Sequence, residues 1–178
     1  DALADLNAAL PRGQLFAPGA QGRNIGISAL SAVSDHDFLV MERDNRGVST
    51  DDPTGSVPVA SKRIYRIDLD GATNVSQITI EGTSALVGVV PAAKTLVFDV
   101  AAALARRGLA IPEKIEGLAI GRRLRNGRSL LLLASDNDFS VTQVAGGAGA
   151  QRDVCTDGRS SAQVPVGAGC PAGLSLIP

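Results

Sequence analysis

The sequence predicts an all-β protein, mainly antiparallel, built from β-propeller-like blades and carrying one or two short helices. Three observations lead to this prediction. Short runs with strand character recur along the chain, turn-forming residues separate them, and one hairpin pattern occurs twice. Radial repetition of small antiparallel units is the arrangement that a propeller provides. We therefore expect the chain to form part of a propeller.

Six segments carry the main strand signals. One of them, residues 62–69, alternates polar and apolar side chains with the period of a half-buried strand. Another, residues 129–134, is almost entirely apolar, which predicts a fully buried strand. A further short strand is expected at 77–80, and no regular structure is assigned after residue 139. The six strands are predicted at 25–30, 38–44, 62–69, 94–99, 114–119 and 129–134.

Two short helices are expected. The Ala-rich segment 100–107 follows Asp99, a good N-cap residue, and precedes Gly108, a typical helix stop. At the N-terminus, leucines recur at helical spacing within residues 1–12, and Pro11 then ends the pattern.

The hairpin pattern that occurs twice consists of a short strand, a turn and an apolar strand that ends in aspartate. Residues 27–30 align with 115–118 at an offset of 88, and residues 38–44 align with 130–136 at an offset of 92. The second copy has the longer turn. This alignment places Asp44 and Asp136 at equivalent strand ends.

Composition excludes several classes of function. The net charge is −1 and the Lys and Arg residues are mostly scattered, so we expect no nucleic-acid partner. No apolar run approaches the roughly 18 residues of a membrane span, so no transmembrane segment is expected. Four arginines do gather within 121–128. Because Asn126-Gly127 is a strong hairpin signal, we interpret this segment as a solvated turn, with an anion site as the alternative.

The two cysteines, Cys155 and Cys170, lie in the Gly- and Ser-rich C-terminal segment. A disulfide between them would close a short loop and indicate an oxidising compartment, and two unpaired thiols are the alternative. With His36 the single histidine in the sequence, a zinc site is not expected.

Five segments, at 24–28, 38–44, 94–96, 114–119 and 135–139, occur in an order and spacing similar to those of one known family. Together they resemble the phytase-like domain, also described as "esterase-like activity of phytase", over about residues 23–140. The resemblance implies a secreted or periplasmic bacterial protein with a propeller fold and a calcium-dependent phosphoric ester hydrolase activity. Ser28 departs from the pattern, because it occupies the position that Glu116 has in the second copy.

Members of this family are usually nearly twice as long as this chain. The resemblance therefore implies one partial domain over 1–178, with the motifs in 23–140 and a C-terminal segment at 141–178. The expected partners are the N-terminal half of the same domain or other subunits, because half a propeller leaves sheet edges open. A phosphate-ester substrate is the expected ligand.

The residues at the strand ends supply a chemistry that fits this family. Calcium takes six to eight oxygen ligands, mostly from carboxylates and carbonyls. Arginine and lysine bind phosphate, so Arg43 and Lys94 are the expected substrate-binding residues. The expected catalytic residues are Arg43, Lys94, Glu116 and Asp136. The expected metal ligands are Glu42, Asp44, Glu116, Asp136 and Asn137.

The alternative is that the same charges neutralise one another. Glu42 would then pair with Arg43, and Lys94 with Glu116, in a noncatalytic propeller that serves as a binding or assembly module with a structural calcium ion. Asp138, beside Asn137, is expected to form a turn.

Overall fold

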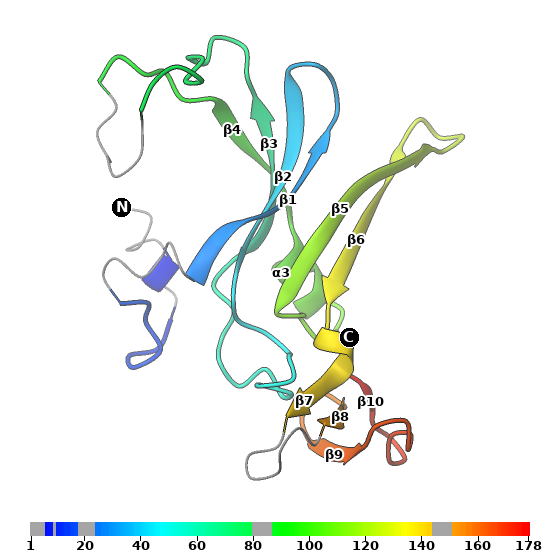
Figure 1. Cartoon of the computed structure of the whole chain (residues 1–178). Helices are drawn as coiled ribbons and strands as arrows, with labels where there is room; N and C mark the ends of the chain where they lie inside the picture. Colours follow the sequence, from blue (N-terminus) through cyan, green and yellow to red (C-terminus); the bar gives the residue numbers. More distant parts are fainter. Residues whose placement is uncertain (1–5, 9, 18–23, 80–86, 144–150) are drawn as a thin grey trace.

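The computed structural model describes residues 6–8, 10–17, 24–79, 87–143 and 151–178. Its main unit is a four-stranded antiparallel sheet in which neighbours along the chain are neighbours in space (Figure 1). This arrangement confirms the mainly antiparallel all-β prediction. The strands, in the order β1-β2-β3-β4, are β1 (Ile25–Ala32), β2 (Asp37–Asp44), β3 (Lys62–Asp68) and β4 (Ala93–Asp99).

A second unit follows directly. The short helix α3 (Val100–Ala105) leads to an antiparallel hairpin of β5 (Lys114–Arg123) and β6 (Ser129–Asp136). Figure 1 shows this hairpin beside the first sheet, with its tip projecting away from the rest of the chain. A four-stranded antiparallel meander is the unit expected for one propeller blade, but the propeller itself stays a prediction. The described strands do not close into a ring.

Helix α3 forms as its sequence predicts. The Asp99 carboxylate accepts a hydrogen bond from the amide of Ala102 at 2.8 Å, which caps the first turn. After the helix, Gly108 adopts a φ of +65°, a conformation that glycine takes without steric cost. The predicted N-terminal helix falls partly outside the described residues.

The main core lies between the first sheet, α3 and β5. Met41 from β2 and Ile64 from β3 are fully buried there against Val100 and Ile115. Because side chains alternate along a strand, these residues place one face of the sheet against the following unit. Packing of this face therefore fixes β5 beside β2.

The repeated hairpin is present, and both copies carry a β-bulge at the equivalent residue. In the first copy the register shifts between Ile27 and Ala29, leaving Ser28 as the extra residue. In the second it shifts between Ile115 and Gly117, leaving Glu116 as the extra residue. Bulges re-aim side chains and are common beside active sites.

The strand register corrects one detail of the predicted repeat. Glu42 pairs with Ile27, and Ser135 pairs with Ile115, so the second strands align at an offset of 93 rather than 92 (135 − 42). Asp44 is therefore equivalent to Asn137, and Asp136 is equivalent to Arg43. The apolar run in the second copy lacks the alternation of polar and apolar side chains that would reveal a one-residue shift in the alignment.

Two further predictions about strands are wrong. Every residue of β6 is exposed, and Leu130 to Leu133 are between 37% and 54% accessible, although an apolar run predicts burial. Among the described residues, β6 pairs only with β5, so nothing covers its second edge. Residues 77–79 form a turn and bend instead of a strand, and residue 80 lies outside the described residues.

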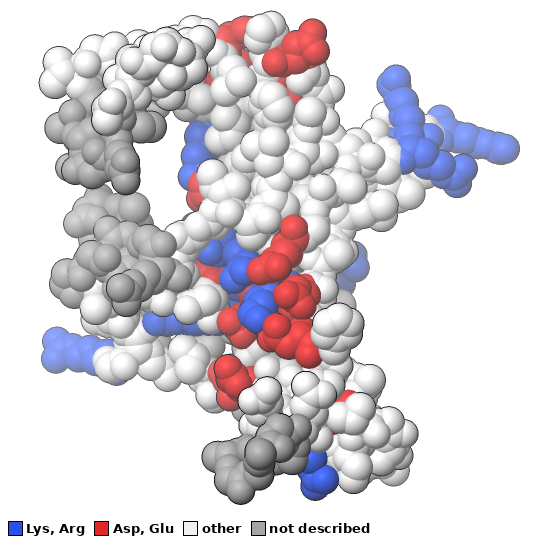
Figure 2. Space-filling model, viewed as in Figure 1, with Lys and Arg blue, Asp and Glu red and all other residues white. Residues whose placement is uncertain are grey.

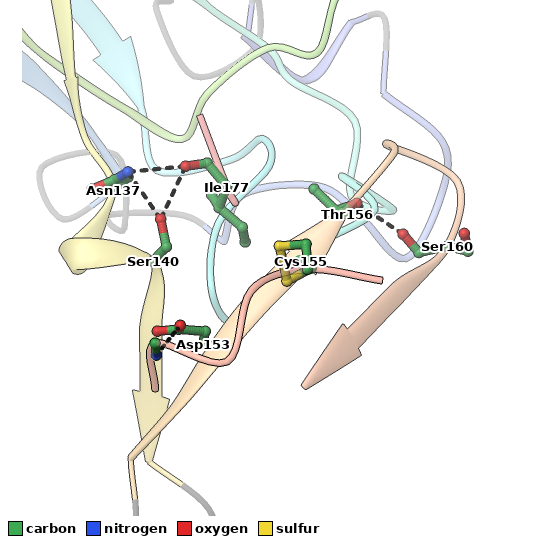
Figure 3. Close-up of a disulfide and its surroundings, with 9 residues drawn as sticks. Asn137, Ser140, Asp153, Cys155, Thr156, Ser160 and Ile177 are labelled. Atoms are coloured by element: carbon green, nitrogen blue, oxygen red, sulfur yellow. Dashed lines mark hydrogen bonds between the residues drawn. A yellow bond between two sulfur atoms is a disulfide. The ribbon is translucent and has the colours of Figure 1, made fainter. Parts of the chain in front are cut away.

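The C-terminal segment forms a small sheet that the sequence did not predict. It follows a 3-10 turn, η1 (Asp138–Ser140), and its strands pair antiparallel with β8 at the centre. The strands are β7 (Val141–Gln143), β8 (Gln151–Thr156), β9 (Ser161–Pro165) and β10 (Ser175–Leu176). The predicted disulfide between Cys155 and Cys170 is present and ties β8 to the segment before β10 (Figure 3).

This small sheet is attached to the end of β6. Val154 and Ile177 form a second buried cluster with Val48 from the long loop after β2. Asp153 accepts a hydrogen bond from the amide of Gly167 at 2.8 Å, which orders the turn after β9.

Within the described part of the chain, no helix is long and apolar enough to cross a membrane.

Candidate functional site

The candidate site lies where β2 ends beside the start of β5. Arg43 lies on the same face of β2 as Met41 and is directed toward β5. Its Nη2 atom donates a hydrogen bond to Oε1 of Glu116 at 2.5 Å. Since Glu116 is the bulge residue of β5, the bulge presents this carboxylate to Arg43. The pair therefore joins the two structural units, with the bulge residue of β5 as one of its members.

A polar cleft of about 360 Å³ surrounds this pair. Ser28, the bulge residue of β1, donates a hydrogen bond to the carbonyl of Ile115 at 2.7 Å and so ties β1 to β5 at the cleft. Ser28, which occupies the position that Glu116 has in the second copy, therefore serves as a structural link and adds no carboxylate to the cleft. The cleft is lined by residues 24–28 with Arg43, Asn45 and Glu116.

The Arg43 guanidinium is not fully satisfied. Its Nη1 atom donates to the carbonyl of Asp44 at 3.4 Å, and Nη2 is bonded to Glu116. Its Nε atom is buried and has no hydrogen-bond partner among the described residues. A buried donor without a partner costs about 1–3 kcal/mol, so it marks a place where a ligand or water is expected.

Lys94 and Glu42 form a separate pair on the other face of the sheet. Glu42 precedes Arg43 in β2, so its side chain is directed to the opposite side. There Lys94 binds the Glu42 carboxylate, and its Nζ atom lies 4.1 Å from the centre of the Tyr65 ring. These residues line a different cleft from that of Arg43. The structure therefore does not bring the two predicted phosphate-binding cations together.

The alternative prediction, in which Glu42 pairs with Arg43 and Lys94 pairs with Glu116, names the wrong partners. Glu42 pairs with Lys94 rather than with Arg43, and Arg43 pairs with Glu116. Consecutive residues of a strand face opposite ways, so Glu42 and Arg43 are held apart by the pleat itself. The charges are nevertheless paired, and Figure 2 shows acidic and basic side chains side by side near the centre of the molecule.

Asp44 forms a buried ion pair with Lys62, the first residue of β3. The Lys62 Nζ atom lies 2.8 Å from Oδ1 of Asp44, and neither side chain is exposed. Lys62 also donates to the carbonyls of Asp44 and Glu113. Burial lowers the pKa of the Lys62 ammonium group, and the nearby Asp44 carboxylate opposes this effect. With its oxygens also accepting the amide of Ser61 at 3.1 Å, Asp44 anchors the loop between β2 and β3.

Asp136 and Asn137 lie at the end of β6, where they shape the turn into the C-terminal sheet. Asp136 accepts a hydrogen bond from the amide of Asp138 at 3.0 Å. The Asn137 amide group donates to Ser140 at 3.0 Å and to the carbonyl of Ile177 at 2.9 Å, as Figure 3 shows. Both residues hold local structure, and Asn137 connects β6 to the C-terminus.

Asp138 does more than form the predicted turn. Its Oδ2 atom accepts a hydrogen bond from Nζ of Lys114 at 2.6 Å, which connects the turn to the start of β5. This hydrogen bond raises the pKa of the Lys114 ammonium group.

The five predicted metal ligands are thus divided among separate places. The part of the chain that the structure describes contains no group of three or more His, Cys, Asp or Glu side chains that could hold a metal ion. The cleft beside Arg43 offers one carboxylate, Glu116, which is already paired. Since calcium needs six to eight oxygen ligands, the described residues do not form a complete calcium site.

The sequence matches the family described as "Phytase-like: Esterase-like activity of phytase" over residues 6–139. The chain belongs to this family. The match covers the four-stranded sheet, α3, the β5–β6 hairpin and the charged residues between them. No curated protein and no solved structure matches the chain. The disulfide-linked C-terminal segment lies outside the matched residues.

Three residues that shape the site were not predicted from the sequence: Ser28, Lys62 and Lys114. A signal for Lys62 was available, because alternation places it on the same strand face as the buried Ile64. A lysine on a buried face requires an acidic partner. The roles of Ser28 and Lys114 depend on contacts between distant segments, which the sequence pattern does not contain.

Proposed function

We propose that this chain is part of an extracytoplasmic, phytase-like phosphoric ester hydrolase in which the cleft beside Arg43 and Glu116 binds the phosphate group. The observation that carries this proposal is the buried Nε atom of Arg43, which has no partner among the described residues. Guanidinium donors bind phosphate oxygens in a fork geometry, so an oxygen at Nε and Nη2 would satisfy the group. The family match supports phosphoric ester chemistry for the chain as a whole.

Glu116 has two roles in the proposal. Without substrate it neutralises Arg43, and its side chain is 41% exposed, so it can rotate toward solvent when an anion arrives. A carboxylate beside the bound phosphate can then accept a proton from the attacking water. Asp136 and Lys94, the other two residues expected to be catalytic, lie outside this cleft and have no part in the proposed proton transfer.

The proposal of calcium rests on the family resemblance. Glu116 would be the ligand that the cleft contributes, and the other proposed ligands, Glu42, Asp44, Asp136 and Asn137, lie in the separate places described above. Calcium when bound supplies positive charge to a phosphoryl group. The described residues do not complete its coordination shell, so the proposed role of Glu116 as proton acceptor does not depend on calcium.

The cleft proposal is tested by hydrolysis of p-nitrophenyl phosphate and of phytate by the full-length protein, with added calcium and with a chelator. Arg43→Lys keeps the charge and removes the fork, and we expect kcat/KM to fall about 10- to 100-fold. Glu116→Gln removes the proton acceptor and is expected to lower kcat. Arg63→Lys is the matched control, because Arg63 pairs with Asp99 away from the cleft. Unchanged activity in both cleft variants would overturn the proposal.

A noncatalytic binding or assembly module is the second candidate. It is favoured by the pairing of Arg43, Lys62, Lys94 and Lys114 with carboxylates, which is what a purely structural network would show. A rise in melting temperature with calcium, without turnover of either substrate, would support this candidate.

We also propose that the open edge of β6 pairs with a further part of the same domain or with another subunit. The equivalent strand of the first copy, β2, is paired on both edges, and an exposed apolar edge favours association. Sedimentation of the 178-residue chain tests this proposal, which a fully folded, monodisperse monomer would contradict. An extracytoplasmic location is supported by the Cys155–Cys170 disulfide.

A further inference from the structure

The tip of the β5–β6 hairpin carries a concentrated positive charge. Four arginines lie there within seven residues, and all four are exposed. None takes part in an ion pair with a described residue, and Arg123 donates only to the carbonyl of Gly127 at 3.2 Å. Figure 2 shows basic side chains projecting at this end of the molecule, apart from the acidic ones. The four are Arg122, Arg123, Arg125 and Arg128, which we call the arginine tip.

The first copy of the repeat shows that this charge is not required by the fold. Its hairpin turns through Asp35, His36 and Asp37, which carry two negative charges instead of four positive ones. The second copy is five residues longer across the turn, because its strand offsets are 88 and 93. In repeat proteins, insertions in single repeats fall in loops on one face, which is often the binding face. The arginine tip is such an insertion.

The chemistry of the tip indicates the kind of partner. Arginine binds phosphate groups through paired donors, so clustered arginines fit a surface that carries many phosphates. The tip is a projection rather than a groove, and the hairpin from 114 to 136 contains no aromatic residue on which a base could stack. These features argue against a nucleic acid and favour an extended anionic surface.

Apolar side chains lie directly behind the arginines on the same hairpin. Ile120 is 37% exposed, Leu130 41% and Leu132 54%, and Leu124 lies within the turn itself. A basic edge backed by exposed apolar side chains is the combination that binds at the interface of an anionic bilayer, where the arginines meet the headgroups. We propose that the arginine tip docks the protein onto the surface of an anionic phospholipid membrane.

Docking by the tip would leave the candidate site free. Glu116 lies near the start of β5, whereas the arginines lie at the end of that strand and in the turn after it, so the two lie at opposite ends of the hairpin (Figure 1). Each basic residue near an anionic surface strengthens binding about fivefold at low salt. Removing all four is therefore expected to weaken binding several hundredfold.

The test is sedimentation of the chain with vesicles of phosphatidylcholine alone and with 30% phosphatidylglycerol. We expect binding only to the anionic vesicles and its loss in 1 M salt, where charges are screened beyond about 3 Å. The variant with all four tip arginines changed to Gln should lose binding. A matched control changes four exposed arginines elsewhere, Arg12, Arg106, Arg107 and Arg159, to Gln and removes the same total charge.

Three outcomes would overturn the proposal. Equal weakening by the two quadruple variants would show that only net charge matters, and equal binding to neutral vesicles would show that the arginines are not responsible. Binding to a DNA duplex as tightly as to anionic vesicles would assign the tip to nucleic acid instead. Unchanged melting temperatures of both variants would show that the comparison is between folded proteins.

Discussion

Lys62 and Asp44 form an ion pair that is completely removed from solvent, with Nζ and Oδ1 2.8 Å apart. It connects the end of β2 to the start of β3, and a third hydrogen bond extends it to the carbonyl of Glu113 before β5. If one partner of a buried ion pair is removed, the other charge is left in the interior without a partner. The pair therefore holds together the region in which the candidate site is built.

We expect Lys62→Met and Asp44→Asn each to lower the free energy of unfolding by about 3–5 kcal/mol. The double variant Lys62→Met with Asp44→Asn should lose less stability than the sum of the two single variants, because no charge remains buried. Lys94→Met is the control, since Lys94 is 41% exposed and its pair should contribute no more than about 1 kcal/mol. Urea denaturation measures all four proteins. If Lys62→Met and Asp44→Asn lose no more unfolding free energy than Lys94→Met, the expectation is contradicted.

Gly47 is predicted to be intolerant of any side chain. Its φ is +127°, and a Cβ atom there would lie 2.5 Å from the carbonyl oxygen of Ile111. That backbone is fixed by the bridge between Val48 and Pro112 and cannot easily move. Gly47→Ala should therefore cost about 3 kcal/mol or more.

Gly71 provides the matched control for Gly47. It also has a positive φ, of +77°, but nothing lies within 4 Å of its Cβ position. Gly71→Ala should cost only about 1–2 kcal/mol, the price of the left-handed conformation. Thermal and urea unfolding of the two variants test the difference. Equal losses of stability would show that the backbone around Gly47 moves to accommodate the added methyl group.

Asp157 should make stability depend on pH in the acid range. The amides of Ser160 and Arg159 donate to its carboxylate and hold its pKa below the ordinary value of 3.8. A carboxyl group with a lowered pKa in the folded state stabilises the protein above pH 3.8, and this contribution is lost as the pH falls through the folded pKa. Asp157→Asn keeps an acceptor oxygen but removes the charge.

The urea midpoint of the wild type should therefore exceed that of Asp157→Asn at pH 6, and the difference should shrink toward pH 2.5. Matched measurements at four or five pH values provide the check. A difference that stays constant with pH would show that the Asp157 charge contributes nothing.

The Cys155–Cys170 disulfide closes a loop of 15 residues, for which the chain-entropy model gives about 3 kcal/mol. Replacing both cysteines with serine should destabilise the small C-terminal sheet more than the main core. Amide hydrogen exchange resolves the two regions, with Val154 and Ile177 reporting on the first and Met41 and Ile64 on the second. If amide exchange becomes faster by the same factor in both regions, the two regions unfold as a single cooperative unit.

The class of fold and most strands of residues 25–136 followed from the sequence, because their signals are local. Alternation at residues 62–69, the N-cap at Asp99 and the repeated hairpin all depend on neighbours in the chain. The C-terminal strands were missed because they are short and lie within a Gly- and Ser-rich segment. A disulfide and contacts with Val48 hold them in place, and the local pattern contains neither.

The candidate site was predicted only in part. The sequence indicated the Arg43 and Glu116 positions, and the structure brings them together across two units. It places Lys94, Asp44, Asp136 and Asn137 in other surroundings, because the direction of a side chain depends on the strand face, the bulge and the register. A one-residue difference in register changed which residue is equivalent to Asp44.

The sequence by itself determined most strands between residues 25 and 136, the presence of the repeat, the family motifs and the chemical groups available at the strand ends. Only the tertiary structure decided which charges meet, because partners such as Arg43 and Glu116 are 73 residues apart and are joined by packing of β5 against β2. Local propensity specifies where a strand forms. The pairing of its side chains depends on bulges and on core contacts that bring distant segments together.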